Sequence, residues 1–290
     1  QDPPPPPRRA PRAEPHGSAG GRSRGGACGD YSMPDDPTIF RDRFAAGEAL
    51  VGTFLKIAHT MPAEVIATAG FDFVVVDEEH APFNRESTDR IILACRAYGI
   101  GALVRVPSPS ADAILGVLDS GADGVLVPHV DSAAKAAEIV AAARYRGGAR
   151  GFSPTTRAGR FGKAKMAEHM DDQDARATVI AMIEDASALD HLDAIMAVDG
   201  LDGVFIGRGD LTVALGAPNN QAPDVRDAVA RISAAARAAG KIVCVMVNGA
   251  LDTREMAALS ATAFIVSSDQ VMLRTAAEKT VADTRSALTN

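Results

Sequence analysis

The chain has 290 residues with 47% hydrophobic content and a formal net charge of -7, which suits one large single-core domain and argues against nucleic acid or another polyanion as a partner. No apolar run approaches the roughly 18 residues of a membrane span, and no secretion signal opens the chain. Three cysteines, Cys28, Cys95 and Cys244, lie far apart without metal-type or redox spacing, so we expect a soluble protein of the reducing cytoplasm.

The first 32 residues are rich in Pro, Gly, Arg and Ser, unlike the rest of the chain. They lack the apolar side chains whose burial would offset the entropy cost of ordering, so residues 1–32 are predicted to be a disordered tail and residues 33–290 a single domain. The first methionine is Met33, so we expect the segment before it to be a vector remnant or an over-extended start. A basic transit peptide is the alternative.

From residue 50 onward, short β-branched runs alternate with Ala-rich runs whose apolar residues recur at helical spacing. This alternation indicates βα units around a parallel sheet that helices cover. Eight such runs favour a closed α/β barrel, the TIM (β/α)8 fold, over an open doubly wound sheet. The predicted strands cover residues 50–56, 73–77, 102–106, 124–127, 179–184, 203–207, 242–247 and 263–267, and helices are predicted, for example, at 87–98, 133–144 and 225–239.

The stretch from residue 146 to 176 interrupts this alternation. Long connections in compact domains are usually functional or disordered. We expect the Gly- and Arg-rich segment RGFSPTTRAGRFG at 150–162 to form a loop over the mouth of the site, with a solvated surface excursion as the alternative.

Barrel active sites lie at the C-terminal ends of the strands, so the polar residues that end each apolar run are candidates. Glu184 ends the run VIAMIE, and Asp210 follows the next strand across a Gly-Arg-Gly turn. A carboxylate on an apolar strand is costly unless it is paired or bound to a metal. The two carboxylates form a minimal site for Mg²⁺ or Mn²⁺, with Co²⁺ as a further candidate. The alternative is a salt-bridged Glu184 and an N-capping Asp210.

Asp77, Glu79 and His80 lie just past the second predicted strand, where a carboxylate can hold an imidazole in one tautomer and raise its basicity. His80 is therefore the candidate general base, and a merely solvated side chain is the alternative. We expect Glu78 at the surface.

Arg105 lies within the apolar segment LVRVP, where a permanent charge is costly unless it faces an anion. That anion is an enolate or carboxylate oxygen of a ligand, or else a neighbouring acid such as Glu79. Lys56, near the end of the first strand, is an alternative that would form a Schiff base with a 2-oxo acid. His129 is placed at the rim by the segment LVPHV and has no assigned role.

Together these segments resemble the HpcH/HpaI aldolase family, the class II, metal-dependent pyruvate aldolases, from about residue 52 to residue 277. Several short motifs occur in the right order at the right barrel positions, which makes the resemblance specific. The segments are DEEHAPFN at 77–84, LVRVP at 103–107, SGADGVLVPHV at 120–130, ARGFSPTTRA at 149–158, MIED at 182–185 and DGVFIGRGDLTVALG at 202–216.

The resemblance implies a TIM barrel of the phosphoenolpyruvate/pyruvate type. It also implies a divalent metal bound by Glu184 and Asp210, a base at His80 that Asp77 orients, and an anion-stabilising Arg105.

Substrate binding is implied as well: pyruvate would chelate the metal, and its carboxylate would accept backbone N–H groups of Gly209 and Asp210 at a helix start. Many relatives have Gly at position 78, Gln at 182 and Pro-Ala at 208–209, where this chain has Glu78, Met182 and Arg208-Gly209. Arg208 is expected either to add a second cationic contact to the substrate or to point into solvent.

The expected activity is reversible aldol cleavage of a 4-hydroxy-2-oxo acid to pyruvate, or a related 2-oxo acid, and an aldehyde. Two alternatives remain: a lyase acting on an acyl-CoA or a dicarboxylate in the citrate lyase-like superfamily, and a non-catalytic 2-oxo-acid sensor. The expected partners are these small molecules and further copies of the chain, since the resemblance implies a hexamer built partly through the C-terminal helix near residues 271–288.

Overall fold

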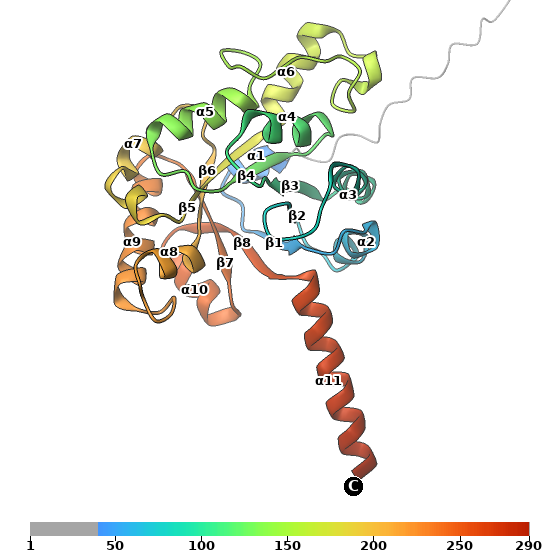
Figure 1. The fold of residues 1–290 in the computed structure, drawn as a ribbon, viewed down its shortest axis with the longest axis vertical. Coiled ribbons are helices and arrows are strands. Elements are labelled where there is room, and N and C mark those ends of the chain that lie inside the picture. The colour runs from blue at the N-terminus through green and yellow to red at the C-terminus, as the bar shows by residue number, and fades with distance from the viewer. Residues whose placement is uncertain (1–39, 290) are drawn as a thin grey trace, which may run out of the picture. The chain divides into compact units, whose positions relative to one another are not determined.

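The computed structural model describes residues 40–289, so the predicted tail at 1–32, with Cys28, and the start at Met33 lie outside the described residues. Eight strands form one closed barrel in which each strand pairs in parallel with the next and the last pairs with the first (Figure 1). The predicted α/β barrel is confirmed. The strands are β1 (Leu50–Leu55), β2 (Phe73–Asp77), β3 (Gly101–Arg105), β4 (Gly124–Val127), β5 (Thr178–Ile183), β6 (Gly203–Ile206), β7 (Ile242–Val247) and β8 (Ala261–Ser268).

Helices follow the strands and cover the outside of the barrel, with further helical segments in the longer connections (Figure 1). They are α1 (Phe40–Ala45), α2 (Thr60–Thr68), α3 (Arg85–Tyr98), α4 (Ala111–Asp119), α5 (Ala133–Ala143), η1 (Arg160–Gly162), α6 (Met166–Arg176), η2 (Ala186–Asp190), α7 (Leu192–Met196), α8 (Arg208–Ala214), α9 (Pro223–Ala238), α10 (Ala250–Ala258) and α11 (Asp269–Thr289).

Apolar side chains fill the inside of the barrel as well as the layer between strands and helices. At the N-terminal end of the strands, Phe40 and Phe44 of α1 pack with Phe73 and close the barrel. Gly52 makes room for this packing, because a Cβ atom there would lie 2.4 Å from the Phe73 ring. The barrel is therefore a packed core, open to a ligand only at its other end.

The connection from residue 146 to 176 does not lie over the mouth of the barrel, which corrects the expectation from the sequence. It holds α6, and its Arg150 and Ala158 bind Asp119 at the end of α4. A connection that leaves a helix and enters a strand begins at the N-terminal end of the barrel, opposite the active-site end. Arg157 of this connection binds Asp89 on α3, along the outside of the barrel.

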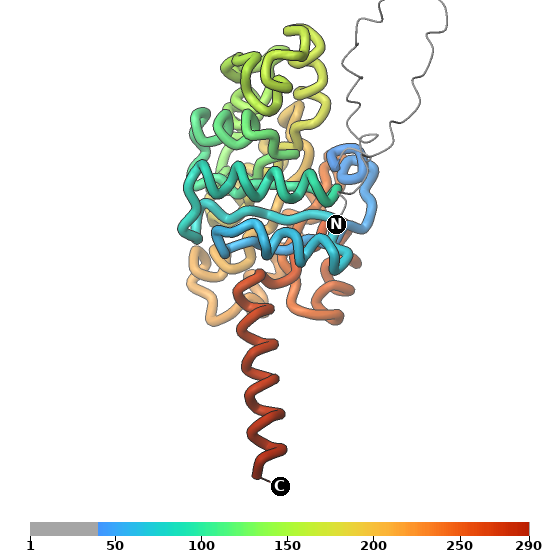
Figure 2. Tube along the Cα trace, turned by 90° about the vertical axis from the view of Figure 1, so that its right-hand side faces the viewer, coloured from blue at the N-terminus to red at the C-terminus, as the bar shows by residue number. Residues whose placement is uncertain are grey.

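The last helix, α11, leads away from the barrel (Figures 1 and 2). Every residue from Leu273 to Thr289 is exposed, including the large apolar side chains of Leu273, Val281 and Leu288. Among residues 40–289, no helix is both long enough and apolar enough to cross a bilayer.

Candidate active site

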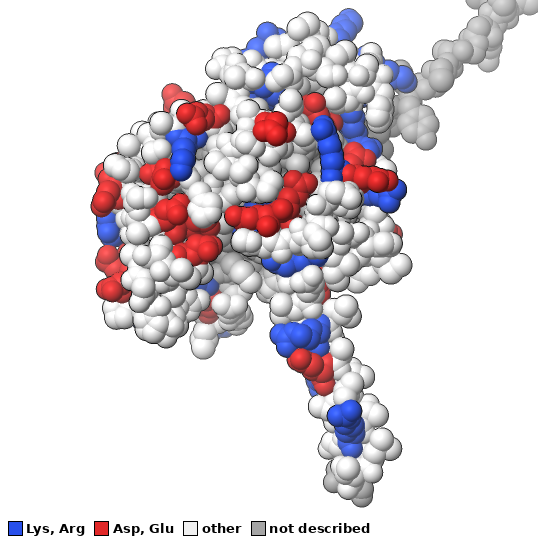
Figure 3. All heavy atoms as spheres, in the orientation of Figure 1, with Lys and Arg blue, Asp and Glu red and all other residues white. Residues whose placement is uncertain are grey.

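A cavity of about 520 Å³ opens at the C-terminal ends of the strands, where the sequence predicts the site. Phe54, Met182 and Phe205 line it and also belong to the apolar cluster inside the barrel, so they form its floor. Figure 3 shows several Asp and Glu side chains around the middle of the face that Figure 1 views. The walls of the cavity include Lys56, Arg105, Arg208, Gly209, Asp210, Asn248 and Val271.

Asp77, at the end of β2, is fully buried and holds two cations. Its oxygens accept Nε and Nη2 of Arg105 at 2.9 and 2.7 Å, and Nζ of Lys56 lies 2.6 Å from Oδ2. Burial opposes ionisation of this carboxyl, but the hydrogen bonds from Arg105 and Lys56 outweigh it and lower the Asp77 pKa to about 2. Both cations therefore face the cavity in fixed positions, with part of their hydrogen-bonding capacity unused.

Asp77 does not contact the imidazole of His80, contrary to the role that the resemblance implied. It accepts the backbone N–H of His80 at 3.1 Å. Glu79 is the carboxylate beside the ring, with Oε2 at 3.6 Å from Nε2 of His80. Side chains with neighbouring numbers at a strand end project in different directions, so spacing alone does not decide which acid meets the ring. His80 itself is exposed and lies outside the cavity lining.

Glu79 also approaches Arg105, with Oε2 at 3.3 Å from Nη1. The ion pair that the sequence offered as an alternative for Arg105 is therefore present, beside the stronger one with Asp77. The guanidinium lies 4.8 Å from the centre of the Phe54 ring, within the range of a cation–π contact. Arg105 consequently combines a structural role with a place in the cavity wall.

Glu184, directly after β5, is buried, and its two oxygens are treated differently. Oε1 accepts the backbone N–H of His129 at 2.9 Å, whereas Oε2 has no hydrogen-bond partner among residues 40–289. Burial raises the Glu184 pKa to about 7, and the charge of nearby Asp210 adds to the shift. A buried carboxylate oxygen without a donor is the environment that a cation would satisfy.

The turn after β6 brings Asp210 to the same rim. Gly207 packs so closely on Glu184 that a Cβ atom there would lie 2.5 Å from the Glu184 Cβ. The Asp210 side chain is exposed and has no hydrogen bond or ion pair among the described residues. Among residues 40–289, no group of three or more His, Cys, Asp or Glu side chains is arranged to hold a metal ion, so a cation here would take its remaining ligands from water or a substrate.

His129 is a rim residue to which the sequence gave no role. It has a positive φ of 55°, uncommon for a side-chain-bearing residue. Its Nδ1 lies 3.2 Å from Asp185 and 3.6 Å from Glu184, and its Nε2 lies 4.0 Å from Glu79. Partial burial would lower the His129 pKa, but the hydrogen bond to Asp185 and the nearby carboxylates outweigh it and raise the pKa.

Arg208 does not point into solvent, which was one of the two positions expected for it, but lies in the wall of the cavity. It is buried, and its Nη atoms donate to both oxygens of Asp252 and to the carbonyl oxygen of Met246. Glu78 also departs from its predicted surface position: it is half-buried and accepts a hydrogen bond of 2.6 Å from Thr88. Neither Asp252 nor Thr88 carries a motif that would have shown these pairings.

Comparison with known proteins identifies relatives over most of the chain. The family model described as HpcH/HpaI aldolase/citrate lyase matches residues 50–276. A 4-hydroxy-2-oxovalerate aldolase of Rhodococcus jostii (strain RHA1) is 42% identical over 205 residues, 70% of this chain and 78% of that one. A 5-keto-4-deoxy-D-glucarate aldolase of Shigella dysenteriae serotype 1 (strain Sd197) is 34% identical over 250 residues, 86% of this chain and 96% of that one.

Among solved structures, an HpcH/HpaI aldolase from Desulfitobacterium hafniense DCB-2 superposes with a TM-score of 0.80 at 27% identity, over 85% of this chain and 96% of that chain. The agreement in fold thus accompanies a detectable similarity in sequence.

The two cations on Asp77 lead to a prediction about acid stability. We expect Asp77→Asn to lower the free energy of unfolding by about 3–5 kcal/mol at neutral pH, because it leaves Arg105 buried without its partner. The folded-state pKa of Asp77, about 2, is below the unfolded value of about 3.9. The stabilisation should therefore be complete above pH 4 and decline as the pH falls through 2.

Urea unfolding of wild type and Asp77→Asn from pH 7 to pH 2.5 measures this difference, which should shrink at the acidic end. Asp131→Asn, which removes a partly exposed ion pair with Lys135, is the control and should cost less than about 1 kcal/mol. A difference that stays constant over the whole range would show that ionised Asp77 does not provide the stability.

Proposed function

Because the chain belongs to the HpcH/HpaI aldolase/citrate lyase family, we propose that it cleaves a 4-hydroxy-2-oxo acid, by a reversible aldol reaction, to pyruvate or a related 2-oxo acid and an aldehyde. It is a carbon–carbon lyase of the aldolase type, like its named relatives. The name of the Rhodococcus relative contains a substrate of this class, 4-hydroxy-2-oxovalerate, which supports the choice.

The observation that carries the proposal is the buried, unpartnered Oε2 of Glu184 beside the unpaired carboxylate of Asp210. These oxygen ligands fit a hard divalent cation, Mg²⁺ or Mn²⁺, with Co²⁺ as a further candidate. When bound, such a cation supplies Lewis-acid polarisation of the keto oxygen of the substrate. Gly207 contributes by leaving the space in which Glu184 lies.

Substrate binding is assigned to the residues around this carboxylate pair. The backbone N–H groups of Gly209 and Asp210, in the first turn of α8, would donate hydrogen bonds to the carboxylate of the 2-oxo acid. Arg105, held by Asp77 in the cavity wall, would donate to the oxygen on which the enolate charge develops. Such fixed donors stabilise developing charge in place of water, and this is commonly the largest contribution to catalysis.

The proton of the 4-hydroxyl group must leave for the C3–C4 bond to break. We assign its removal to His80, directly or through a water molecule, with Glu79 rather than Asp77 beside the ring. Arg208 takes no substrate contact in this proposal, because Asp252 and Met246 occupy its guanidinium.

The metal requirement yields a direct prediction. Pyruvate release from a 4-hydroxy-2-oxo acid should stop in EDTA and return with Mg²⁺, Mn²⁺ or Co²⁺, since two carboxylates alone cannot polarise the keto group. Borohydride with pyruvate should leave Lys56 unmodified, because its amine is ion-paired with Asp77 and a Schiff base needs a free amine.

Full activity in EDTA with covalent trapping at Lys56 would contradict the metal mechanism. Cleavage of a CoA thioester but not of free hydroxy-oxo acids would favour the citrate lyase-like alternative, and metal-dependent binding of pyruvate without turnover would favour a sensor.

A second prediction separates Arg105 from His80. Arg105→Ala should lower kcat about 100-fold to 1,000-fold, and His80→Ala should have an effect of similar size. Exchange of the pyruvate methyl protons with D2O, followed by NMR, needs an enolate but no aldol hydroxyl. Arg105→Ala should therefore exchange far more slowly than wild type, whatever His80→Ala does, because that base could also take the methyl proton.

Arg157→Ala, which breaks an ion pair with Asp89 outside the cavity, is the matched control and should keep wild-type exchange. If Arg105→Ala exchanges at the wild-type rate, Arg105 serves only the ion pair with Asp77.

We further propose that copies of the chain associate through α11, as the hexamer implied by the family resemblance would require. The exposed apolar side chains of Leu273, Val281 and Leu288 support this, because such residues on an unpacked helix gain free energy by burial against a partner. Asp269, at the start of α11, accepts the backbone N–H groups of Lys56 and Ile57, so α11 begins at a fixed point beside the site.

Removal of residues 273–290 should reduce the molar mass measured by light scattering from that of a hexamer to that of a smaller species. The truncation keeps Asp269 and the cavity-lining Val271, so the barrel should remain folded by circular dichroism. Arg274→Ala, which removes only an exposed pair with Glu278, should leave the mass unchanged. Equal masses for the truncated and full chains would show that α11 does not hold copies together.

A further inference from the structure

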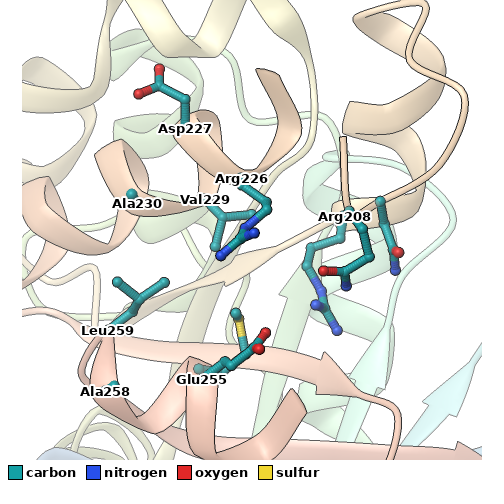
Figure 4. A pocket seen from close by; sticks show the side chains of 11 residues that line it. Arg208, Arg226, Asp227, Val229, Ala230, Glu255, Ala258 and Leu259 are labelled. Carbon is teal, nitrogen blue, oxygen red and sulfur yellow. The ribbon is translucent and has the colours of Figure 1, made fainter. Parts of the chain in front are cut away.

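The Arg208 side chain lies between two cavities. It lines the cavity at the mouth of the barrel and also a second one of about 520 Å³ between α9 and α10. Figure 4 shows Arg208 at one side of this second cavity, whose other side holds Glu255, Ala258 and Leu259. Only 6% of Arg208 is exposed, so its side chain separates the two cavities and does not extend into solvent.

Asp252, in the first turn of α10, accepts hydrogen bonds from two residues, Arg208 of α8 and Asn248 after β7. Its Oδ1 and Oδ2 accept Nη1 and Nη2 of Arg208 at 2.8 and 2.6 Å, and Oδ2 also accepts the backbone N–H of Asn248 at 2.7 Å. Arg208 in turn donates to the carbonyl oxygen of Met246 on β7. The pair therefore ties the start of α8 to the end of β7 and the start of α10.

The α8 turn is held by the residues on either side of Asp210 rather than by Asp210 itself. Asp210 makes no side-chain hydrogen bond or ion pair among the described residues. Gly209 has an open space where a Cβ atom would be, and glycine restricts the backbone least of all residues. The fixed points around Asp210 are Gly207, which packs against Glu184, Arg208, which Asp252 holds, and Leu211, which is fully buried and donates its N–H to the carbonyl oxygen of Gly207.

We propose that the Arg208–Asp252 pair positions the carboxylate of Asp210 opposite Glu184, so that it sets the affinity of the site for a divalent cation without touching cation or substrate. The inference rests on the proposed function, because it presumes that Glu184 and Asp210 bind the cation. Arg208 is a positioning residue: its charge is neutralised by Asp252, and its Nη atoms are engaged. Supporting residues of this kind typically change metal affinity or activity by about 10-fold to 100-fold when lost.

The chain offers a matched control at the opposite end of the barrel. Asp202 precedes β6, and its Oδ2 accepts Nη2 of Arg144 at 3.1 Å and the backbone N–H of Val179 at 2.8 Å. Like Asp252, Asp202 joins a guanidinium to a backbone N–H group, and its Oδ1 also accepts Nε and Nη2 of a second arginine, Arg41. Asp202 lies far from Asp210. Comparing Asp252→Asn with Asp202→Asn therefore separates an effect on the position of Asp210 from a general loss of fold stability.

In the experiment, protein stripped of metal is titrated with Mn²⁺, and the EPR signal of the unbound ion gives the Kd. The temperature is kept well below the lowest Tm among the wild type and the variants. Asp252→Asn should raise the Kd at least about 10-fold, while Asp202→Asn should lower the Tm and leave the Kd unchanged. The double variant Arg208→Gln, Asp252→Asn has the wild-type net charge and should also bind weakly. Arg208→Lys keeps the charge but loses the paired hydrogen bonds of the guanidinium to Asp252. It supplies the test if the larger changes prevent folding.

Three results would overturn the inference. The first is an unchanged Kd in Asp252→Asn and Arg208→Lys. The second is a wild-type Kd in the double variant, which would show that only the change in net charge matters. The third is an equal loss of affinity in Asp202→Asn. Wild-type protein that binds no Mn²⁺ would instead overturn the metal site of the proposed function, and the inference with it. In turnover, the variants should regain much of their kcat at saturating Mn²⁺, which a residue that contacts the substrate would not allow.

Discussion

The carboxylates of Asp77 and Glu184 are buried at the mouth of the barrel, and the cost of taking a carboxylate out of water decides what must surround each of them. Asp77 meets that cost with Arg105 and Lys56, and its pKa falls to about 2. Glu184 receives one backbone N–H group and has no Lys or Arg partner among the described residues, only the partly exposed His129 at 3.6 Å, and its pKa rises to about 7. Asp77 is thus neutralised by ion pairs within the protein. Glu184 is the carboxylate at which the proposed function places a cation.

The remaining charges at the rim follow from this division. The pair Arg208–Asp252 is internally neutral, and Glu79 lies near Arg105 and the two rim histidines, His80 and His129. The uncompensated negative charge is thus concentrated on Glu184 and Asp210, one strand apart. A divalent cation would neutralise both carboxylates. Its affinity would therefore depend on how the α8 turn places Asp210 relative to Glu184.

Most of the barrel could be predicted from the sequence, because each buried strand is a short β-branched run bounded by turn residues, and the predicted ends differ from those observed by two residues or fewer. The partners of the polar residues could not. Asp77 and Arg105 meet because they are register partners on β2 and β3, and register is a property of the closed sheet rather than of either segment. Asp252 is equally hidden, since it lies 44 residues from Arg208.

The apolar interior links the stability of the fold to the electrostatics of the site. Phe54 packs edge-on against Phe205 beneath Arg105, while Phe40 and Phe44 close the other end of the barrel. Water therefore reaches the charged layer only from the mouth. In such a setting charges interact more strongly than in water, which favours a fixed Arg105 and penalises an unpaired Glu184 alike. The same packing that makes the barrel stable thus raises the cost of the buried Glu184 Oε2, which has no hydrogen-bond partner among the described residues, and this cost is what a bound cation would relieve in the proposed function.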